Sequence, residues 1–139
     1  MKLILKDHST YIIRIDRGEE IVETLKEFVE EKGIDSAICS MIGAVGELEL
    51  WWYDTAKKEY DKKTFAEQLE IADVSGNIAE MQGEIIVHLH GTFGRKNFSV
   101  VAGHIHRAVV SGACEVELRE LNGVIERKYD EETGLNLFI

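Results

Sequence analysis

The sequence predicts an α+β domain, in which a mostly antiparallel sheet of about six or seven strands carries one main helix packed on it. Three observations lead to this prediction. A single segment, EEIVETLKEFVEEK (residues 19–32), has helical periodicity. Most of the apolar segments after it are short and have the alternation of strands. Glycine, asparagine and aspartate interrupt these segments at short intervals, whereas proline is absent.

The chain is expected to form a single domain over residues 1–139. Its length suits one core, and it contains no proline, repeat or polar linker. The apolar fraction of 45% is typical of a globular protein, and no apolar run is long enough to span a membrane. The N-terminal segment alternates between apolar and polar residues, unlike a signal peptide. These features predict a soluble, cytoplasmic protein without a membrane partner.

The first expected element is an alternating strand over residues 3–15, interrupted by a turn near Asp7-His8-Ser9. The helix follows at residues 19–32. Its apolar stripe has helical spacing, acidic residues occupy its first turn, and Gly33 follows as a C-terminal stop. The stripe consists of Ile21, Val22, Leu25, Phe28 and Val29.

The remaining segments are expected to be strands. Ser75-Gly76-Asn77 is interpreted as a turn between two of them, or alternatively as the polar wall of a pocket. Cys39 and Cys114 lie in apolar segments and lack CxxC spacing, so both are expected to be reduced core residues. The expected strand segments are residues 34–54, 64–81, 84–93, 97–110, 113–121 and 127–139.

Four of the five histidines lie between residues 87 and 108, in two His-x-His pairs. Because alternate side chains of a strand share a face, His88 and His90 project side by side, and so do His104 and His106. If the two segments form a hairpin, a register of like parity places His104 beside His88 or His90. Directly opposed side chains then have Cβ atoms about 5 Å apart.

This arrangement predicts a metal site. Three imidazoles on rigid strands, without a cysteine nearby, suit a borderline divalent ion, and zinc is the predicted metal. A three-histidine set leaves one coordination position for water, a carboxylate or a small ligand. The alternative is that the histidines are hydrogen-bonded, partly buried residues without a metal. Strand spacing alone does not determine which three of the four would bind, and His8 is expected to be an exposed turn residue.

Two features near the histidines have alternative interpretations. Trp51 and Trp52 are consecutive on a strand, so one is expected to pack inward and the other to be exposed, at a subunit interface or a binding surface. Arg107 follows the second histidine pair. Its expected role is a surface ion pair, and the alternative is to hold an anionic ligand at the metal.

The net charge of −10, from 26 acidic and 16 basic residues, bears on the partners of the chain. DNA-binding proteins gain much of their affinity by neutralising phosphates with lysine and arginine. This sequence has no basic cluster longer than two residues. Direct nucleic-acid binding by this chain alone is therefore not expected.

The motifs HExxH, Walker A, GxGxxG and GxSxG are all absent. The sequence alone therefore identifies no catalytic residue. A metal-dependent hydrolase or lyase is one alternative function, with Glu84, Glu115 or Glu117 as the candidate general base. A second alternative is a regulatory or interaction module for DNA-associated proteins.

Several segments together resemble the plants-and-prokaryotes-conserved (PPC) domain family, which occurs alone in bacteria and archaea and is fused to AT-hook motifs in plants. The resemblance covers nearly the whole chain. The order and spacing of GNI, HLH and a Gly-His pair are its most specific part. The matching segments are Gly18-Glu19, IGAVGELEL, LEIADVSGNIAEMQGEIIVHLH, VVAGHI and ACEVELRE.

The resemblance implies a compact domain that assembles as a homotrimer, with zinc bound through histidines in some prokaryotic members. The HxH of the family corresponds to His88 and His90, and its Gly-Gly-His corresponds to Ala102-Gly103-His104. The implied metal ligands are therefore His88, His90 and His104, with His106 ranked fourth. The AT-hook core requires Arg-Gly-Arg-Pro, and this chain has no proline. The DNA binding of the plant members is therefore not expected here.

Overall fold

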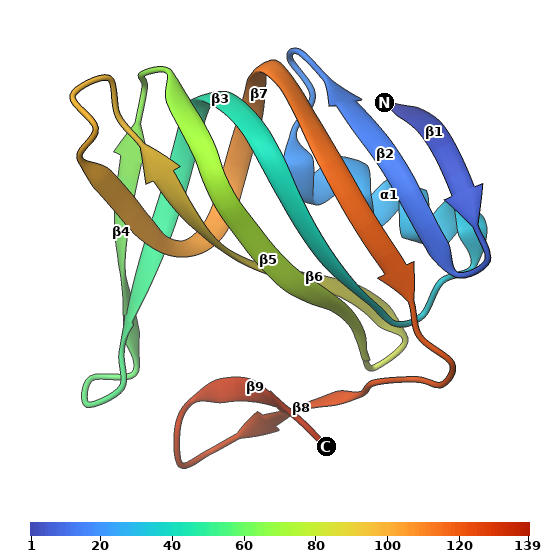
Figure 1. The fold of residues 1–139 in the computed structure, drawn as a ribbon. Coiled ribbons are helices and arrows are strands. Elements are labelled where there is room, and N and C mark those ends of the chain that lie inside the picture. The colour runs from blue at the N-terminus through green and yellow to red at the C-terminus, as the bar shows by residue number, and fades with distance from the viewer.

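The computed structural model describes residues 1–139 and contains nine strands and one helix. It confirms the predicted α+β class (Figure 1). The helix is α1 (Ile21–Lys32), and the strands are β1 (Lys2–Asp7), β2 (Thr10–Asp16), β3 (Ala37–Asp54), β4 (Glu59–Phe65), β5 (Leu69–Met81), β6 (Glu84–Gly94), β7 (Val100–Glu120), β8 (Arg127–Asp130) and β9 (Leu135–Phe138).

Seven strands form one antiparallel sheet in the order β1-β2-β7-β6-β5-β3-β4. Strand β3 also pairs with β7, so that β3, β5, β6 and β7 form a closed circuit of hydrogen-bonded neighbours. Closure of this kind removes the free edges of the strands that take part in it. Strands β8 and β9 form a separate hairpin, which lies at the bottom of Figure 1 beneath the large sheet.

The helix α1 ends where the sequence predicts, at Lys32, but begins at Ile21, two residues after the predicted start. The Glu20 carboxylate accepts a hydrogen bond from the Glu23 backbone N–H at 2.7 Å, and Gly33 ends the helix in the left-handed region at φ 65°. One face is buried, through Ile21, Leu25, Phe28 and Val29. These residues join a single core of 27 buried residues to which every strand from β2 to β7 contributes. The helix is too short to be a candidate membrane span.

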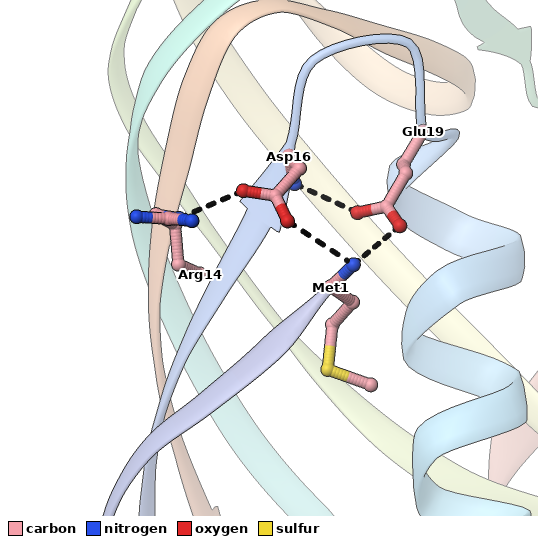
Figure 2. A network of polar contacts seen from close by, with 4 residues as sticks. All are labelled: Met1, Arg14, Asp16 and Glu19. Carbon is pink, nitrogen blue, oxygen red and sulfur yellow. Dashed lines mark hydrogen bonds and ion pairs between the residues drawn. The ribbon is translucent and has the colours of Figure 1, made fainter.

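The N-terminal strand is fixed to the start of the helix by charge (Figure 2). The Met1 ammonium contacts the carboxylates of Glu19 and, at 3.5 Å, Asp16. Asp16 also accepts a hydrogen bond from Arg14 Nε at 2.8 Å, and its backbone N–H donates to Glu19. The hydrogen bond from the ammonium lowers the pKa of the Glu19 carboxyl. The turn before β2, at Asp7-His8-Ser9, is where the sequence predicts it.

The structure corrects several expected strands. Strand β4 was not predicted, and its last two residues were assigned to the expected strand 64–81. Six of its seven residues are exposed, and it has no apolar alternation. The predicted segments 97–110 and 113–121 are not two strands, because residues 100–120 form the single strand β7, which continues through Ser111-Gly112. The predicted turn at Ser75-Gly76-Asn77 is also wrong, because these residues lie inside β5. Residues 127–139 form a hairpin rather than one strand.

Candidate metal site

The structure brings His88, His90 and His104 together on strands β6 and β7. His90 lies directly opposite His104 in the sheet register, and His88 is two residues before His90. The ring centroids are 5.1 Å apart for His88 and His90, 5.0 Å for His88 and His104, and 5.4 Å for His90 and His104. One ligand atom from each ring lies within 4.8 Å of the other two. The parity argument from the sequence predicts this arrangement.

Two glycines allow the neighbouring strands to close around the histidines. A Cβ atom on Gly76 of β5 would overlap the backbone carbonyl oxygen of His88. A Cβ atom on Gly103 of β7 would lie 3.1 Å from the Trp51 carbonyl oxygen of β3. Glycine in a strand interior commonly marks such a close backbone approach. The GNI and Gly-His motifs therefore both contribute strand spacing, and the Gly-His motif also contributes His104 to the cluster.

His90 and His104 belong to a row of side chains that crosses five strands. Register pairs link Ser75 to His90, His90 to His104, His104 to Trp51, and Trp51 to Lys62. Directly paired residues project from the same face of a sheet. Ser75 was assigned to a turn in the sequence, but it flanks the cluster from β5.

His106 shares the strand but lies outside the cluster. The register of β7 against β3 slips at this residue, because Leu50 pairs with Ile105 and Glu49 pairs with Arg107. Such a bulge re-aims the side chain of the extra residue. The His106 ring stacks on Trp51 with a centroid distance of 3.9 Å and an interplanar angle of 15°. The structure thus groups His104, and not His106, with the first pair.

Burial and neighbouring charge keep two of the imidazoles neutral. Desolvation, followed by the charges of Arg127 and His90, lowers the pKa of His88 to about 4. Desolvation, followed by the charges of His88, His90 and His106, lowers the pKa of His104 to about 4. Neutral imidazole is the form that binds a metal ion. Both rings therefore have the required protonation state near neutral pH.

Arg127 of β8 completes the surroundings of His88, a contact that strand patterns in the sequence do not predict. Its Nη2 donates to Asn77 Oδ1 at 2.7 Å and lies 3.2 Å from His88 Nδ1, while Nη1 donates to the Asn136 carbonyl at 2.7 Å. A guanidinium is only a donor, so His88 Nδ1 accepts this bond and a neutral His88 carries its proton on Nε2. The only signal in the sequence was an arginine in the last predicted strand segment.

The C-terminal hairpin that carries Arg127 reaches across to the other side of the sheet. At the end near β3 and β4, Tyr53 donates to the Thr133 carbonyl at 2.7 Å and Lys58 Nζ donates to the Glu131 carbonyl at 2.6 Å. The segment leading into the hairpin is held by Ser36, whose buried Oγ accepts from the Ile125 backbone N–H at 2.7 Å. The hairpin therefore extends from His88 on β6 to Tyr53 on β3 and to Lys58 in the connection between β3 and β4.

The donor set suits a zinc ion. Tetrahedral zinc with Zn–N bonds of 2.0–2.1 Å places its ligand nitrogens about 3.3 Å apart. The ligand nitrogens here all lie within 4.8 Å of one another. The group contains three histidines and no carboxylate. His88, His90 and His104 would therefore hold the ion and leave a position for another ligand.

The candidate general bases do not join this group. Glu84 pairs with Met81 at the far end of the β5–β6 hairpin. Glu115 and Glu117 lie more than ten residues beyond His104 on β7, where they pair with β2. Within one chain, none of these three glutamates is therefore placed to act as a general base at the histidine cluster.

Comparison with known proteins identifies the family. The sequence model of the Plants and Prokaryotes Conserved (PCC) domain matches residues 5–122. The chain belongs to the PCC family. This confirms the resemblance to the PPC domain, and the match ends before Arg127. The comparison with curated proteins gave no match.

Solved structures of three similar proteins share this fold. A putative DNA-binding protein of Bacteroides thetaiotaomicron is 41% identical, with a TM-score of 0.94, and the match covers 97% of this chain and 94% of that one. A metal-containing protein of Archaeoglobus fulgidus is 40% identical, with a TM-score of 0.90 and coverage of 100% and 99%. A PPC protein of Pyrococcus horikoshii is 33% identical, with a TM-score of 0.89 and coverage of 94% and 90%.

In this PCC domain, the residues beside the histidines have separate roles. Arg107 pairs with Glu47 at 2.7 Å, which confirms the expected surface ion pair. Trp52 is 64% exposed, whereas Trp51 is partly buried and has Lys62 Nζ 4.2 Å from its ring centroid. A cavity of about 390 Å³ adjoins Trp51 between β3, β4 and the start of β7, and the three histidines do not line it.

Proposed function

We propose that the chain is a cytoplasmic, homotrimeric PCC-domain protein that binds zinc through His88, His90 and His104 and keeps one coordination position for a small ligand. The observation that carries this proposal is the convergence of three imidazoles from two paired strands. Two of them are neutral because burial lowers their pKa. The similar protein from Archaeoglobus fulgidus is described as metal-containing, which supports a metal here.

Zinc is proposed over other divalent ions because the three donors are imidazole nitrogens. Calcium and magnesium require mostly oxygen ligands, and the cluster offers none from a carboxylate. A bound zinc ion would supply Lewis acidity at its remaining position. The histidines would hold the ion. In the metal-free chain, Arg127 Nη2 contacts both Asn77 Oδ1 and His88 Nδ1.

Metal analysis of the purified protein tests this proposal. Protein prepared without chelators should contain about one zinc per chain after dialysis against buffer, and His88→Ala or His104→Ala should reduce zinc to background. His106→Ala is the matched control on the same strand, because its ring stacks on Trp51 outside the cluster. If His104→Ala kept its full zinc content and His106→Ala lost zinc, the third ligand would be His106 and not His104. Unchanged metal content in both the His88 and His104 variants would overturn the proposal.

The trimeric state is supported by exposed apolar side chains on the outer strand. In β1, Leu3, Ile4 and Leu5 are 43%, 59% and 56% exposed. Exposed apolar side chains on an outer strand are consistent with a protein interface. Light scattering after gel filtration should give three times the chain mass of 15.7 kDa. A mass equal to one chain at micromolar concentration would refute the trimer.

We do not extend the description of the Bacteroides relative as a DNA-binding protein to this chain. The net charge of −10 opposes contact with phosphates. A gel shift with duplex DNA at low salt should show no complex. Binding that weakens steeply with added salt would contradict this expectation, since it would reveal phosphate contacts that the composition does not predict.

A further inference from the structure

We infer that Arg127 is the anion-binding residue of the histidine site, and that its guanidinium leaves His88 when a metal binds and then pairs with a carboxylate ligand at the remaining coordination position. This inference rests on the proposed zinc site. It adds the chemical class of the ligand, a small organic carboxylate, and assigns a role to a hairpin that lies beyond the part of the chain matched by the PCC family.

The first argument concerns the lone pair of His88. A neutral imidazole has one lone pair in the ring plane, and Arg127 Nη2 approaches it at Nδ1, at 3.2 Å. Coordination through Nδ1 would use the same lone pair. Coordination through Nε2 would place the proton on Nδ1, where it would face a second donor. Arg127 and a metal ion therefore compete for His88 whichever nitrogen binds the ion.

The second argument concerns the charge of Arg127. Its hydrogen-bond partners are an amide oxygen of Asn77, the carbonyl of Asn136 and the ring of His88, all of which are neutral. No carboxylate lies within ion-pair distance of the guanidinium, and Nε is buried without a partner. A partly buried cation without a counter-ion is costly, so this position favours an anion.

The third argument concerns how Arg127 is held. The bond from Nη1 to Asn136 and the Phe138 ring, 4.3 Å from the guanidinium carbon, fix the side chain from β9. Neither contact involves His88, so both can persist when Nη2 is released. The planar guanidinium can then offer two parallel N–H groups to a carboxylate, which is a strong and directional pairing. Arg107, the alternative arginine from the sequence, is already paired with Glu47.

A zinc titration of chelator-treated protein tests the inference, with zinc affinity measured by competition against a coloured chelator. The titration is run in sodium acetate, in acetamide as the neutral analogue of the same shape, and in neither. Acetate should tighten zinc binding to the wild type by about tenfold, within the usual range of coupling between two ligands. Acetamide should have no effect.

Arg127→Gln is the decisive variant. Without acetate it should bind zinc at least as tightly as the wild type, because the competitor for His88 is gone, and acetate should no longer change its affinity. Arg127→Lys keeps the charge but lacks the paired N–H groups, so it should retain only part of the acetate effect. Arg107→Gln controls for the loss of one positive charge. Tyr53→Phe removes the bond to Thr133 and controls for loosening of the hairpin. Both controls should behave as the wild type.

The outcomes separate this inference from the proposed function. If the wild type binds no zinc under any condition, the proposed site itself is wrong. If it binds zinc equally with and without acetate, or if Arg127→Gln keeps the full acetate effect, the zinc site stands and the role of Arg127 is overturned. Loss of the acetate effect in Tyr53→Phe would also overturn it, because hairpin position rather than the guanidinium would then be responsible.

Discussion

Acidifying the metal-free protein should reduce its stability through His88 and His104. Both imidazoles have a pKa of about 4 in the folded chain, against an ordinary value of 6.5. Between these values the unfolded chain binds protons that the folded chain does not, and the free energy of unfolding rises with pH wherever this holds. The stability that the two neutral imidazoles contribute is therefore fully present above pH 6.5 and is lost as the pH falls toward 4.

The size of the effect follows from these values. At pH 5 the full shift corresponds to a loss of about 2 kcal/mol for each imidazole relative to neutral pH. Both rings are partly exposed, so solvent screening reduces the loss to about 1 kcal/mol each. The two rings lie 5.0 Å apart and each raises the cost of protonating the other. A loss of about 2 kcal/mol for the pair is therefore expected.

Urea unfolding in the presence of a chelator measures this loss at pH 7 and pH 5. Other groups also titrate in this range, so the informative quantity is the difference between the wild type and the double variant His88→Gln, His104→Gln. The double variant should lose about 2 kcal/mol less than the wild type on acidification. An identical pH dependence in both proteins would show that the histidines are not desolvated as the structure indicates.

Three further outcomes are expected. Gly76→Ala should destabilise the fold by about 1–3 kcal/mol in urea unfolding, because its new Cβ would overlap the carbonyl of His88; an effect below that range would mean that β5 and β6 separate easily. Cys39 and Cys114 should not react with a thiol reagent in the folded protein, since both are buried and burial raises each pKa to about 12; rapid labelling without denaturant would contradict this. Ser36→Ala should cost about 1–3 kcal/mol by leaving the Ile125 N–H without its acceptor, and hydrogen exchange at that amide should increase while exchange in the core of β7 stays slow.

The sequence predicted the part of the site that depends on strand periodicity. The alternation of side chains on a strand is fixed by backbone geometry, so the shared face of His88 and His90 followed from their spacing. The short connection between the two histidine segments favoured a hairpin, and the observed pairing of His90 with His104 is one of the two registers expected. The choice of His104 over His106 came from the family resemblance, because a bulge cannot be read from spacing.

The parts that the sequence did not predict depend on long-range contacts. Gly76 resembles a turn residue locally, yet it lies inside β5 because only glycine allows the close approach to His88. The exposed strand β4 has no apolar pattern to reveal it. Arg127 lies 39 positions from His88 in the chain, and its contact exists only because the last hairpin folds back over the sheet. Local sequence patterns contain no information about such a long-range contact.

The stacking of Trp51 on His106, beside His104, provides an optical signal within the site. Indole emission depends on the charge and polarity of the groups in contact with the ring, and the second tryptophan, Trp52, is 64% exposed and serves as an internal reference. Metal loading or protonation of the histidines should therefore change the emission of Trp51 alone. Trp51→Phe should abolish the response, so that site occupancy can be followed in solution without a label.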